Sequence, residues 1–261
     1  MEQRKIDEIT FHNVVRNTAL KQDESLYEYF WSNRKFYSID GTRKGRVEKW
    51  LSERVPGKHI LDYCSGNGVM SVWVTKQGAA RSTGIDLSDV SVENARKLSV
   101  QEGVDDRCDF IVMDAEQMRF SDNSFDLVYE RGVLHHLNLE KAYSEIARVL
   151  KPEGECICVE SLRHNPVMQW YRRKTPQLRT PWEVEHILGK NQIEYARRYF
   201  NKVEILGLFH LFSFIAVPFR NTKAFDPLLR VFSRVDDIVL KLPGIRWMAW
   251  QVVFTLSDPV K

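Results

Sequence analysis

Short apolar runs alternate with segments of helical periodicity between residues 58 and 160. The apolar runs are residues 59–63, 82–86, 109–113, 125–129 and 155–160. Helical spacing follows at 69–77, at 90–102 with Ser88 or Asp89 as N-cap, and at 139–150, which we expect to stop at 151–154. Strands separated by helices imply parallel units with right-handed crossovers. The pattern predicts an α/β sheet that binds ligands at the carboxyl ends of its strands.

Composition narrows the class of protein. The chain has 261 residues, of which 43% are hydrophobic and 28% charged, with a formal net charge of +3. These values describe one large globular domain and exclude a disordered or collagen-like chain. The small charge gives no argument for nucleic acid as a partner.

The cysteines and histidines predict neither disulfides nor a metal site. Cys64, Cys108, Cys156 and Cys158 form no Cys-x-x-Cys pair, and no histidine cluster has the spacing of zinc ligands. We therefore expect reduced, buried thiols.

The chain start and its most apolar stretch indicate a cytoplasmic protein without stable membrane insertion. The start, MEQRKIDEIT, lacks the apolar core of a signal peptide. Residues 205–219 are apolar but carry His210 and are shorter than the about 20 residues that a membrane span needs.

A glycine-rich turn follows the first predicted strand. Residues 61–68 read LDYCSGNG, so Gly66 and Gly68 stand where a strand ends and a helix begins. Glycines allow a ligand to approach the backbone, and the helix N-terminus offers free N–H groups. The segment fits several nucleotide sites, and the alternative is a tight structural turn.

Acidic residues stand at the ends of the next strands. Asp86 ends the second strand, Asp114 follows the third, and Glu130 with Arg131 lies just past the fourth. A carboxylate in Asp86's place accepts hydrogen bonds from a ribose diol, and Asp114 is positioned to accept from an adenine amino group. The alternative for Asp86 alone is an N-cap or a solvated acid, but the order of these residues along one crevice favours a binding site.

These motifs together resemble class I S-adenosylmethionine-dependent methyltransferases, specifically the small-molecule enzymes of bacterial specialised metabolism. The resemblance covers about residues 58–160 and rests on ILDYCSGNG, TGIDLS, FIVMDAEQMRFSDNSFDLVYERGVLHHL and ARVLKPEGECICVE. It implies a Rossmann-like, mostly parallel seven-stranded sheet with helices on both faces and an antiparallel strand near one edge. Residues 203–209 and 247–256 would supply the last two strands.

The resemblance also implies a set of cofactor contacts, with S-adenosylmethionine as cofactor and S-adenosylhomocysteine as product. The residues implied are Asp62, Tyr63, Cys64, Gly66 and Gly68 around the methionine end, Asp86 and Leu87 at the ribose, Asp114 and Ala115 at the adenine, and Glu130 and Arg131 at the pocket floor. One departure concerns Cys64, because the family often has glycine in this position.

His135 and His136 are the candidate catalytic bases. Methyl transfer from a sulfonium is an in-line displacement that depends on proximity and alignment, so a base is needed only where the acceptor must lose a proton. The same two histidines are commonly structural in the family.

Several segments are candidates for the acceptor side. An aromatic block in residues 1–57 predicts a lid, with packing of a terminal helix as the alternative. The acceptor and lid candidates are Tyr29, Trp31 and Tyr37 in that block, and Glu160, His164 and Asn165 after the fifth strand. The basic residues in 163–179 could bind an anionic acceptor or belong to a solvated loop. The apolar residues in 208–250 could form an acceptor pocket, an oligomer interface or a membrane-facing surface.

The sequence thus predicts one structural domain in three parts. Residues 1–57 form an N-terminal helical lid, 58–160 a cofactor-binding core, and 161–261 a substrate-side insertion with the last two strands. We expect methyl transfer to a small lipophilic acceptor at carbon, oxygen or nitrogen. The sequence does not identify the acceptor, and it does not decide whether methylation is coupled to cyclisation or uses a general base. It also leaves open a homo-oligomer formed through the terminal apolar segments.

Three other functions compete with this one. An NAD(P)-dependent oxidoreductase is disfavoured because Gly66-x-Gly68-x-x-Ser71 lacks the third glycine of a dinucleotide fingerprint. A non-catalytic protein of the same fold is disfavoured by the intact acidic set. An RNA methyltransferase is disfavoured because Glu130-Arg131-Gly132-Val133 stands where a base-stacking motif is expected.

Overall fold

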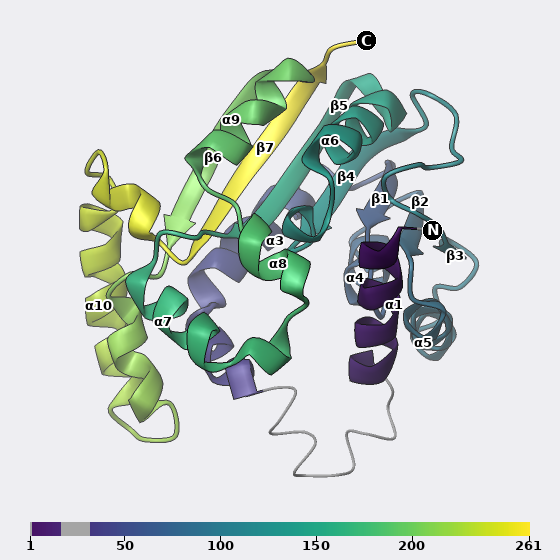
Figure 1. Ribbon diagram of the computed structural model, residues 1–261. Helices are drawn as coiled ribbons and strands as arrows, with labels where there is room; N and C mark the ends of the chain where they lie inside the picture. The colour runs from purple at the N-terminus through teal and green to yellow at the C-terminus, as the bar shows by residue number, and fades with distance from the viewer. Residues whose placement is uncertain (1, 17–31) are drawn as a thin grey trace.

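A computed structural model describes residues 2–16 and 32–261 (Figure 1). Its centre is a seven-stranded sheet in the order β3-β2-β1-β4-β5-β7-β6. The strands are β1 (His59–Tyr63), β2 (Arg81–Asp86), β3 (Cys108–Val112), β4 (Phe125–Arg131), β5 (Leu150–Ser161), β6 (Phe200–Phe209) and β7 (Gln251–Pro259). β7 runs antiparallel to both β5 and β6, and the pairs from β3 to β5 are parallel. The predicted Rossmann-like α/β fold is confirmed.

Helices cover both faces of this sheet. The α-helices are α1 (Gln3–Arg16), α3 (Gly41–Ser52), α4 (Val69–Lys76), α5 (Asp89–Gln101), α6 (Leu139–Val149), α7 (Pro166–Lys174), α8 (Pro181–His186), α9 (Lys190–Tyr195) and α10 (Phe225–Val239). Side chains of α3 and α4 pack on one face, on β1, β4, β5 and β7. Those of α6 and α9 pack on the other. Alternate residues of the central strands enter the two cores, which fixes the register of the sheet.

The last four strands differ from the prediction by more than one residue at a boundary. β4 continues through Glu130 and Arg131, so both belong to the strand. β5 begins at Leu150 and includes residues 151–154, which we expected to be a turn. These residues are extended but irregularly paired, because the register jumps between Leu150 and Glu155.

The other two differences are at the last strands. β6 begins at Phe200, three residues earlier than expected. The last strand begins at Gln251 because the 3-10 helix η7 (Ile245–Met248) occupies the residues before it.

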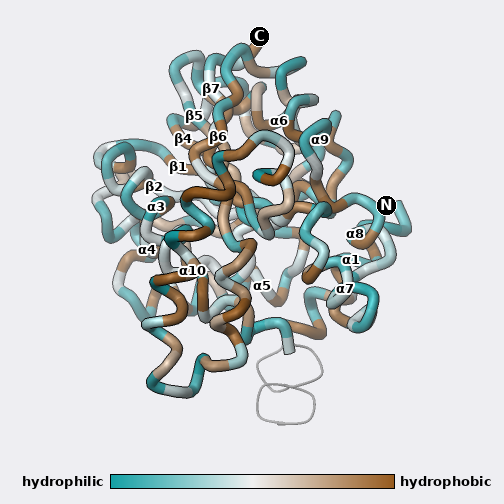
Figure 2. Tube along the Cα trace, turned by 90° about the vertical axis from the view of Figure 1, so that its left-hand side faces the viewer, coloured by the Kyte–Doolittle hydropathy of each residue, from teal (hydrophilic) through white to brown (hydrophobic). Residues whose placement is uncertain are grey.

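Residues of the N-terminal and C-terminal parts pack together beside the sheet. Phe36 in the 3-10 helix η2 (Ser32–Ile39) makes edge-on contacts with Tyr171 of α7, Phe214 of η6 (Ser213–Phe219) and Trp250. α10 lies outside this cluster, and its tube alternates between hydrophobic and hydrophilic residues (Figure 2). Within the part of the chain that the structure describes, no helix combines the length and the apolar character needed to cross a membrane.

Candidate functional site at the carboxyl ends of the parallel strands

The turn between β1 and α4 has three residues in the left-handed region. Cys64, Gly66 and Gly68 have φ values of 58°, 53° and 73°. A Cβ on Gly68 would lie 2.7 Å from Cβ of Ala95 and from the Phe110 ring, so only glycine fits here without displacement. The left-handed backbone at Cys64 explains why glycine is frequent in this position. Burial raises the pKa of the Cys64 thiol well above its usual range, so the group is an un-ionised thiol.

Asp62 and Tyr63 hold this turn from within the protein. Oδ2 of the buried Asp62 accepts hydrogen bonds from the Ser71 amide at 3.0 Å and the Ser71 hydroxyl at 2.7 Å, which anchors the first turn of α4. Burial raises the pKa of Asp62 to about 6. The Tyr63 hydroxyl donates to the Ala115 carbonyl at 2.8 Å and ties β1 to the segment after β3.

Asp86 joins the glycine turn to the start of α5. Its Oδ2 accepts from the Gly66 amide and its Oδ1 from the Ser88 amide, both at 2.9 Å. The Ser88 hydroxyl in turn accepts from the Ser91 amide, which makes Ser88 the N-cap of α5. The carboxylate is therefore fixed in orientation at the tip of β2.

Helix α1 lies across these strand tips, beside α5 (Figure 1). Lys5 Nζ donates to Asp114 Oδ2 at 2.6 Å. Asn13 donates to Asp89 at 2.9 Å and accepts from the Ser88 hydroxyl at 2.6 Å. The Arg16 guanidinium fills the space that a Cβ on Gly66 would occupy.

A cavity with about 100 Å³ of free space remains between α1 and the strand tips. Six of the residues singled out in the sequence line it: Cys64, Asp86, Leu87, Ala115, Arg131 and His136. Gly66 and Asp114 lie at its border, where Arg16 and Lys5 of α1 contact them, whereas Gly68 packs against Ala95 and Phe110. The fold thus brings most of the predicted cofactor set to one crevice.

Glu130, Glu160 and His135 form a buried network behind this crevice. Both carboxyl groups lie close to the Val133 amide, and Glu160 Oε2 is 2.7 Å from His135 Nδ1. Burial, reinforced by the neighbouring Glu160, raises the pKa of Glu130 well above its usual range. Burial opposes ionisation of Glu160 too, but His135 outweighs it and lowers the pKa of Glu160. His135 is thus tied into the network, whereas His136 faces the cavity.

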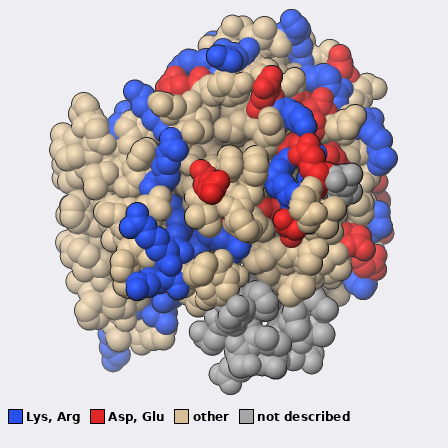
Figure 3. Space-filling view, viewed as in Figure 1, with Lys and Arg blue, Asp and Glu red and all other residues tan. Residues whose placement is uncertain are grey.

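The acceptor and lid candidates do not gather at one place. Tyr29 and Trp31 lie outside the described residues. Tyr37 is 42% exposed and contacts the Trp250 ring edge-on, and His164 is exposed. Asn165 is buried as the N-cap of α7 and donates to the Met248 carbonyl at 2.9 Å. Lys and Arg side chains gather over α7, at the end of which Arg172, Arg173 and Lys174 follow one another (Figure 3).

Sequence reasoning missed the contribution of α1. Lys5, Glu8, His12 and Arg16 all line the cavity. The one available signal was their spacing of three to four residues, which places them on one face of a helix. Nothing in the sequence indicates which surface that face meets.

Comparison with known proteins agrees with this architecture. Residues 61–158 match the model of a family described as a methyltransferase domain. A sterol 24-C-methyltransferase from Gibberella zeae is 37% identical over 139 residues, which cover 49% of this chain and 37% of the relative. The chain spans less than half the length of the curated relatives that it matches.

Two solved structures show the same fold over most of the chain. Geranyl diphosphate C-methyltransferase from Streptomyces coelicolor, solved with Mg²⁺, geranyl diphosphate and S-adenosyl-L-homocysteine, has a TM-score of 0.59 and 15% identity. That match covers 83% of this chain and 79% of the other. The [4+2]-cyclase SpnF has a TM-score of 0.55 and 23% identity over 82% of this chain and 81% of its own. Over residues 61–158 the chain is thus similar to a methyltransferase domain, and its fold is that of the solved S-adenosylmethionine-dependent methyltransferases.

Proposed function

We propose that this chain transfers a methyl group from S-adenosylmethionine to a small, lipophilic acceptor. The observation that carries the proposal is the position of Asp86, whose carboxylate is fixed at the tip of β2 between the glycine turn and α5. A carboxylate in this position suits a ribose diol. Asp114, one strand further along the edge, suits the adenine amino group.

The residues at the strand tips fit this cofactor. Gly66 has no side chain between its backbone and the surface where Arg16 lies, and Asp86 and Asp114 provide negative charge beside it. In the described arrangement the cationic side chains of Arg16 and Lys5 occupy this surface. S-adenosylmethionine carries a sulfonium and an ammonium group, so it would likewise place positive charge beside these carboxylates.

The chain's own part in the reaction is to bind, align and exclude water. S-adenosylmethionine supplies a methyl group on a sulfonium that is already electrophilic. Because Lys5 bonds to Asp114 and Arg16 covers Gly66, cofactor entry requires these α1 side chains to leave the strand tips. We therefore assign the lid role to α1. His136 faces the cavity and is the better placed of the two histidines to accept a proton, if the acceptor must lose one.

The names of relatives support the acceptor class. One relative acts on sterols by its name, and one structural neighbour was solved with geranyl diphosphate. Carbon methylation of a prenyl, sterol-like or quinone-like compound is the narrower proposal. A homo-oligomer and a cytoplasmic location stay predictions.

Calorimetry with S-adenosylhomocysteine tests the cofactor assignment. The wild-type chain should bind this compound and not NAD. Asp86→Asn should weaken binding by about 10–100-fold, because hydrogen bonds to a charged acceptor are lost. Asp109→Asn is the matched control, since Asp109 is exposed at the opposite end of β3 and pairs with Arg81. If the folded chain has no affinity for S-adenosylhomocysteine, the proposal is wrong.

Product masses test the reaction. With S-adenosylmethionine and a panel of prenyl diphosphates, sterols and quinones, we expect a product heavier than its acceptor by one CH₂. The cyclase among the structural neighbours shows that this fold also serves another reaction. A product of unchanged mass formed with the cofactor bound would identify a cyclase and contradict methyl transfer.

A further inference from the structure

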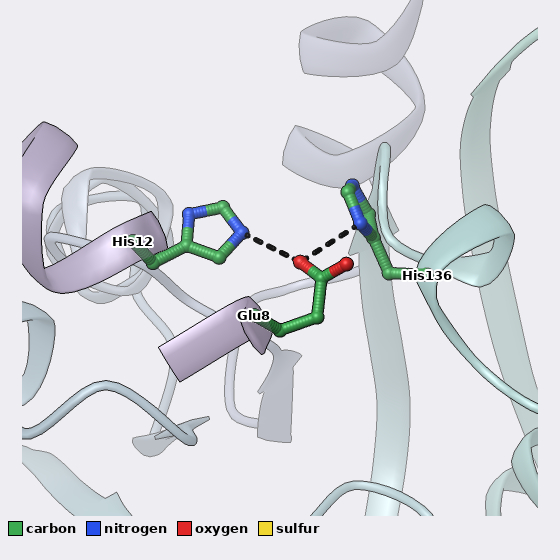
Figure 4. A group of neighbouring side chains, drawn as sticks. All are labelled: Glu8, His12 and His136. Carbon is green, nitrogen blue, oxygen red and sulfur yellow. Dashed lines mark ion pairs between the residues drawn. The ribbon is translucent and has the colours of Figure 1, made fainter. Parts of the chain in front are cut away.

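Two histidines and a glutamate converge at the wall of the cavity (Figure 4). Glu8 and His12 stand one helical turn apart on α1, and His136 belongs to the 3-10 helix η3 (Leu134–His136). Glu8 Oε2 lies 3.4 Å from His12 Nε2 and 3.1 Å from His136 Nδ1. One donor atom from each of the three residues lies within 4.8 Å of the other two.

The atoms that face one another are not satisfied by hydrogen bonds. Glu8 is 6% exposed, and among the described residues neither its Oε2 nor His136 Nδ1 has a hydrogen-bond partner. The two atoms face each other as an ion pair at 3.1 Å. The other oxygen of Glu8 accepts from the Thr180 hydroxyl, which fixes the carboxylate. Buried polar atoms normally have hydrogen-bond partners, and here the ion pairs are the only polar contacts that either atom has among the described residues, which suits an ion that coordinates both.

A metal ion of ordinary size fits between these atoms. Zinc bound tetrahedrally at about 2.0–2.1 Å from nitrogen and oxygen holds its ligand atoms about 3.3 Å apart. The two measured separations from Glu8 Oε2, 3.4 and 3.1 Å, lie on either side of this value. The two imidazole nitrogens need only a side-chain adjustment to complete the set.

We propose that Glu8, His12 and His136 form a binding site for a divalent transition metal, with zinc as the best match. Two imidazoles and one carboxylate suit zinc and its neighbours, whereas magnesium prefers oxygen ligands and water. The sequence predicted no metal site, because the three ligands come from opposite ends of a long stretch of chain.

A neighbouring group of the same kind is a weaker candidate. His135, His136 and Glu183 also bring their donor atoms together. However, His135 Nδ1 is engaged by Glu160 at 2.7 Å, and Glu183 lies 3.3 Å from Arg179. Binding a metal there would break contacts to residues outside the group, whereas at Glu8 the ion pairs that a metal would replace lie within the three ligands themselves.

The metal would link α1 to the loop after β4. Since α1 covers the crevice, an ion between Glu8, His12 and His136 would hold this helix closed over it. Three protein ligands leave at least one coordination position for water or for an oxygen atom of a small molecule in the cavity. A metal on Nδ1 of His136 would also prevent that nitrogen from accepting a proton.

Equilibrium dialysis of the full chain against Zn²⁺, with elemental analysis, gives the direct test. We expect one equivalent of zinc, and Co²⁺ in its place should give the visible absorption of a four-coordinate site. His12→Ala and Glu8→Gln should each weaken zinc binding more than the about 10–100-fold typical of a lost second-shell partner. His164→Ala, which removes an exposed histidine outside the cluster, should leave zinc binding unchanged.

Hydrogen exchange gives a second readout that does not depend on catalysis. Zinc should slow amide exchange across residues 3–16 in the wild-type chain and not in the folded His12→Ala variant. Zinc binding that is absent, or that survives both His12→Ala and Glu8→Gln, would overturn the proposal. Affinity for S-adenosylhomocysteine is measured separately, so a failure of the cofactor assignment leaves this result interpretable.

Discussion

Glu130 and Glu160 share one backbone amide: the Val133 N–H lies 2.8 Å from Oε1 of the first and 2.9 Å from Oε1 of the second. Both side chains are almost completely buried. Two carboxylates in this position cannot both ionise at little cost, so one retains a proton. The raised pKa of Glu130, due to burial and to Glu160, assigns the proton to Glu130. Glu160 keeps the negative charge beside His135.

This asymmetry predicts different outcomes for two similar substitutions. Glu130→Gln should change the free energy of unfolding by less than about 1 kcal/mol, because an amide can donate to Glu160 as the protonated carboxyl does. Glu160→Gln should cost about 1.5–3 kcal/mol, because its charge accepts from His135 and from the Val133 and Leu134 amides. Urea unfolding of the two variants measures the difference. Equal losses of stability would contradict the assignment of the proton.

Asp62 predicts a pH dependence of stability. Burial raises its pKa to about 6 in the folded chain, against about 3.9 in an unfolded one. The folded state therefore binds the proton more tightly, and the resulting stabilisation is complete below about pH 4 and lost as the pH rises through 6. Relative to Asp62→Asn, the wild-type chain should lose about 3 kcal/mol between about pH 3 and pH 7, of which about 2 kcal/mol falls between pH 4 and 6. Urea unfolding at several pH values tests this, and parallel curves for the two proteins would refute it.

Gly68 and Gly103 separate the effect of crowding from that of backbone conformation. Both have positive φ, 73° and 66°. A Cβ on Gly68 would collide with Ala95 and Phe110, whereas one on Gly103 would meet no described atom within 4 Å. Gly103→Ala should cost about 1–2 kcal/mol through backbone strain alone. Gly68→Ala should cost about 1–3 kcal/mol more through overpacking, and similar unfolding free energies would show that the turn relaxes.

Asn165 and His164 are adjacent but differ in burial. Asn165 caps α7 and bonds to the Met248 carbonyl, so Asn165→Ala should destabilise the protein by about 1–3 kcal/mol. His164 is exposed, so His164→Ala should change stability by less than about 0.5 kcal/mol. Thermal unfolding distinguishes a capping residue from a substrate contact. Unchanged stability of Asn165→Ala, with weaker acceptor binding, would restore the substrate role.

The prediction of the cofactor-binding core rested on local sequence patterns. The strand at residues 59–63 matches β1 at both ends, and the glycine turn after it and Ser88 as N-cap are where the sequence indicated. Such features depend on neighbours in the chain, because side-chain period and capping act over a few residues. Parallel topology then brings Asp86 and Asp114 to the same edge.

The missed features depend on contacts between distant segments. The turn expected at residues 151–154 became part of β5, although its pairing with β4 jumps from Leu150 to Glu155 and its pairing with β7 starts at Glu155. The hydrogen bonds from Ser71 to the buried Asp62 were not indicated by the sequence either, and the cofactor contact expected of Asp62 stays a prediction.

The sequence by itself determined the sheet, the glycine turn and the acidic residues at the strand tips, because short-range periodicity encodes them. Only the tertiary structure decided where α1 lies and which side chains meet beneath it. The pairs Lys5–Asp114, Glu8–His136 and Glu130–Glu160 join residues far apart in the chain. Their proximity is set by packing of whole elements, and no local pattern records it.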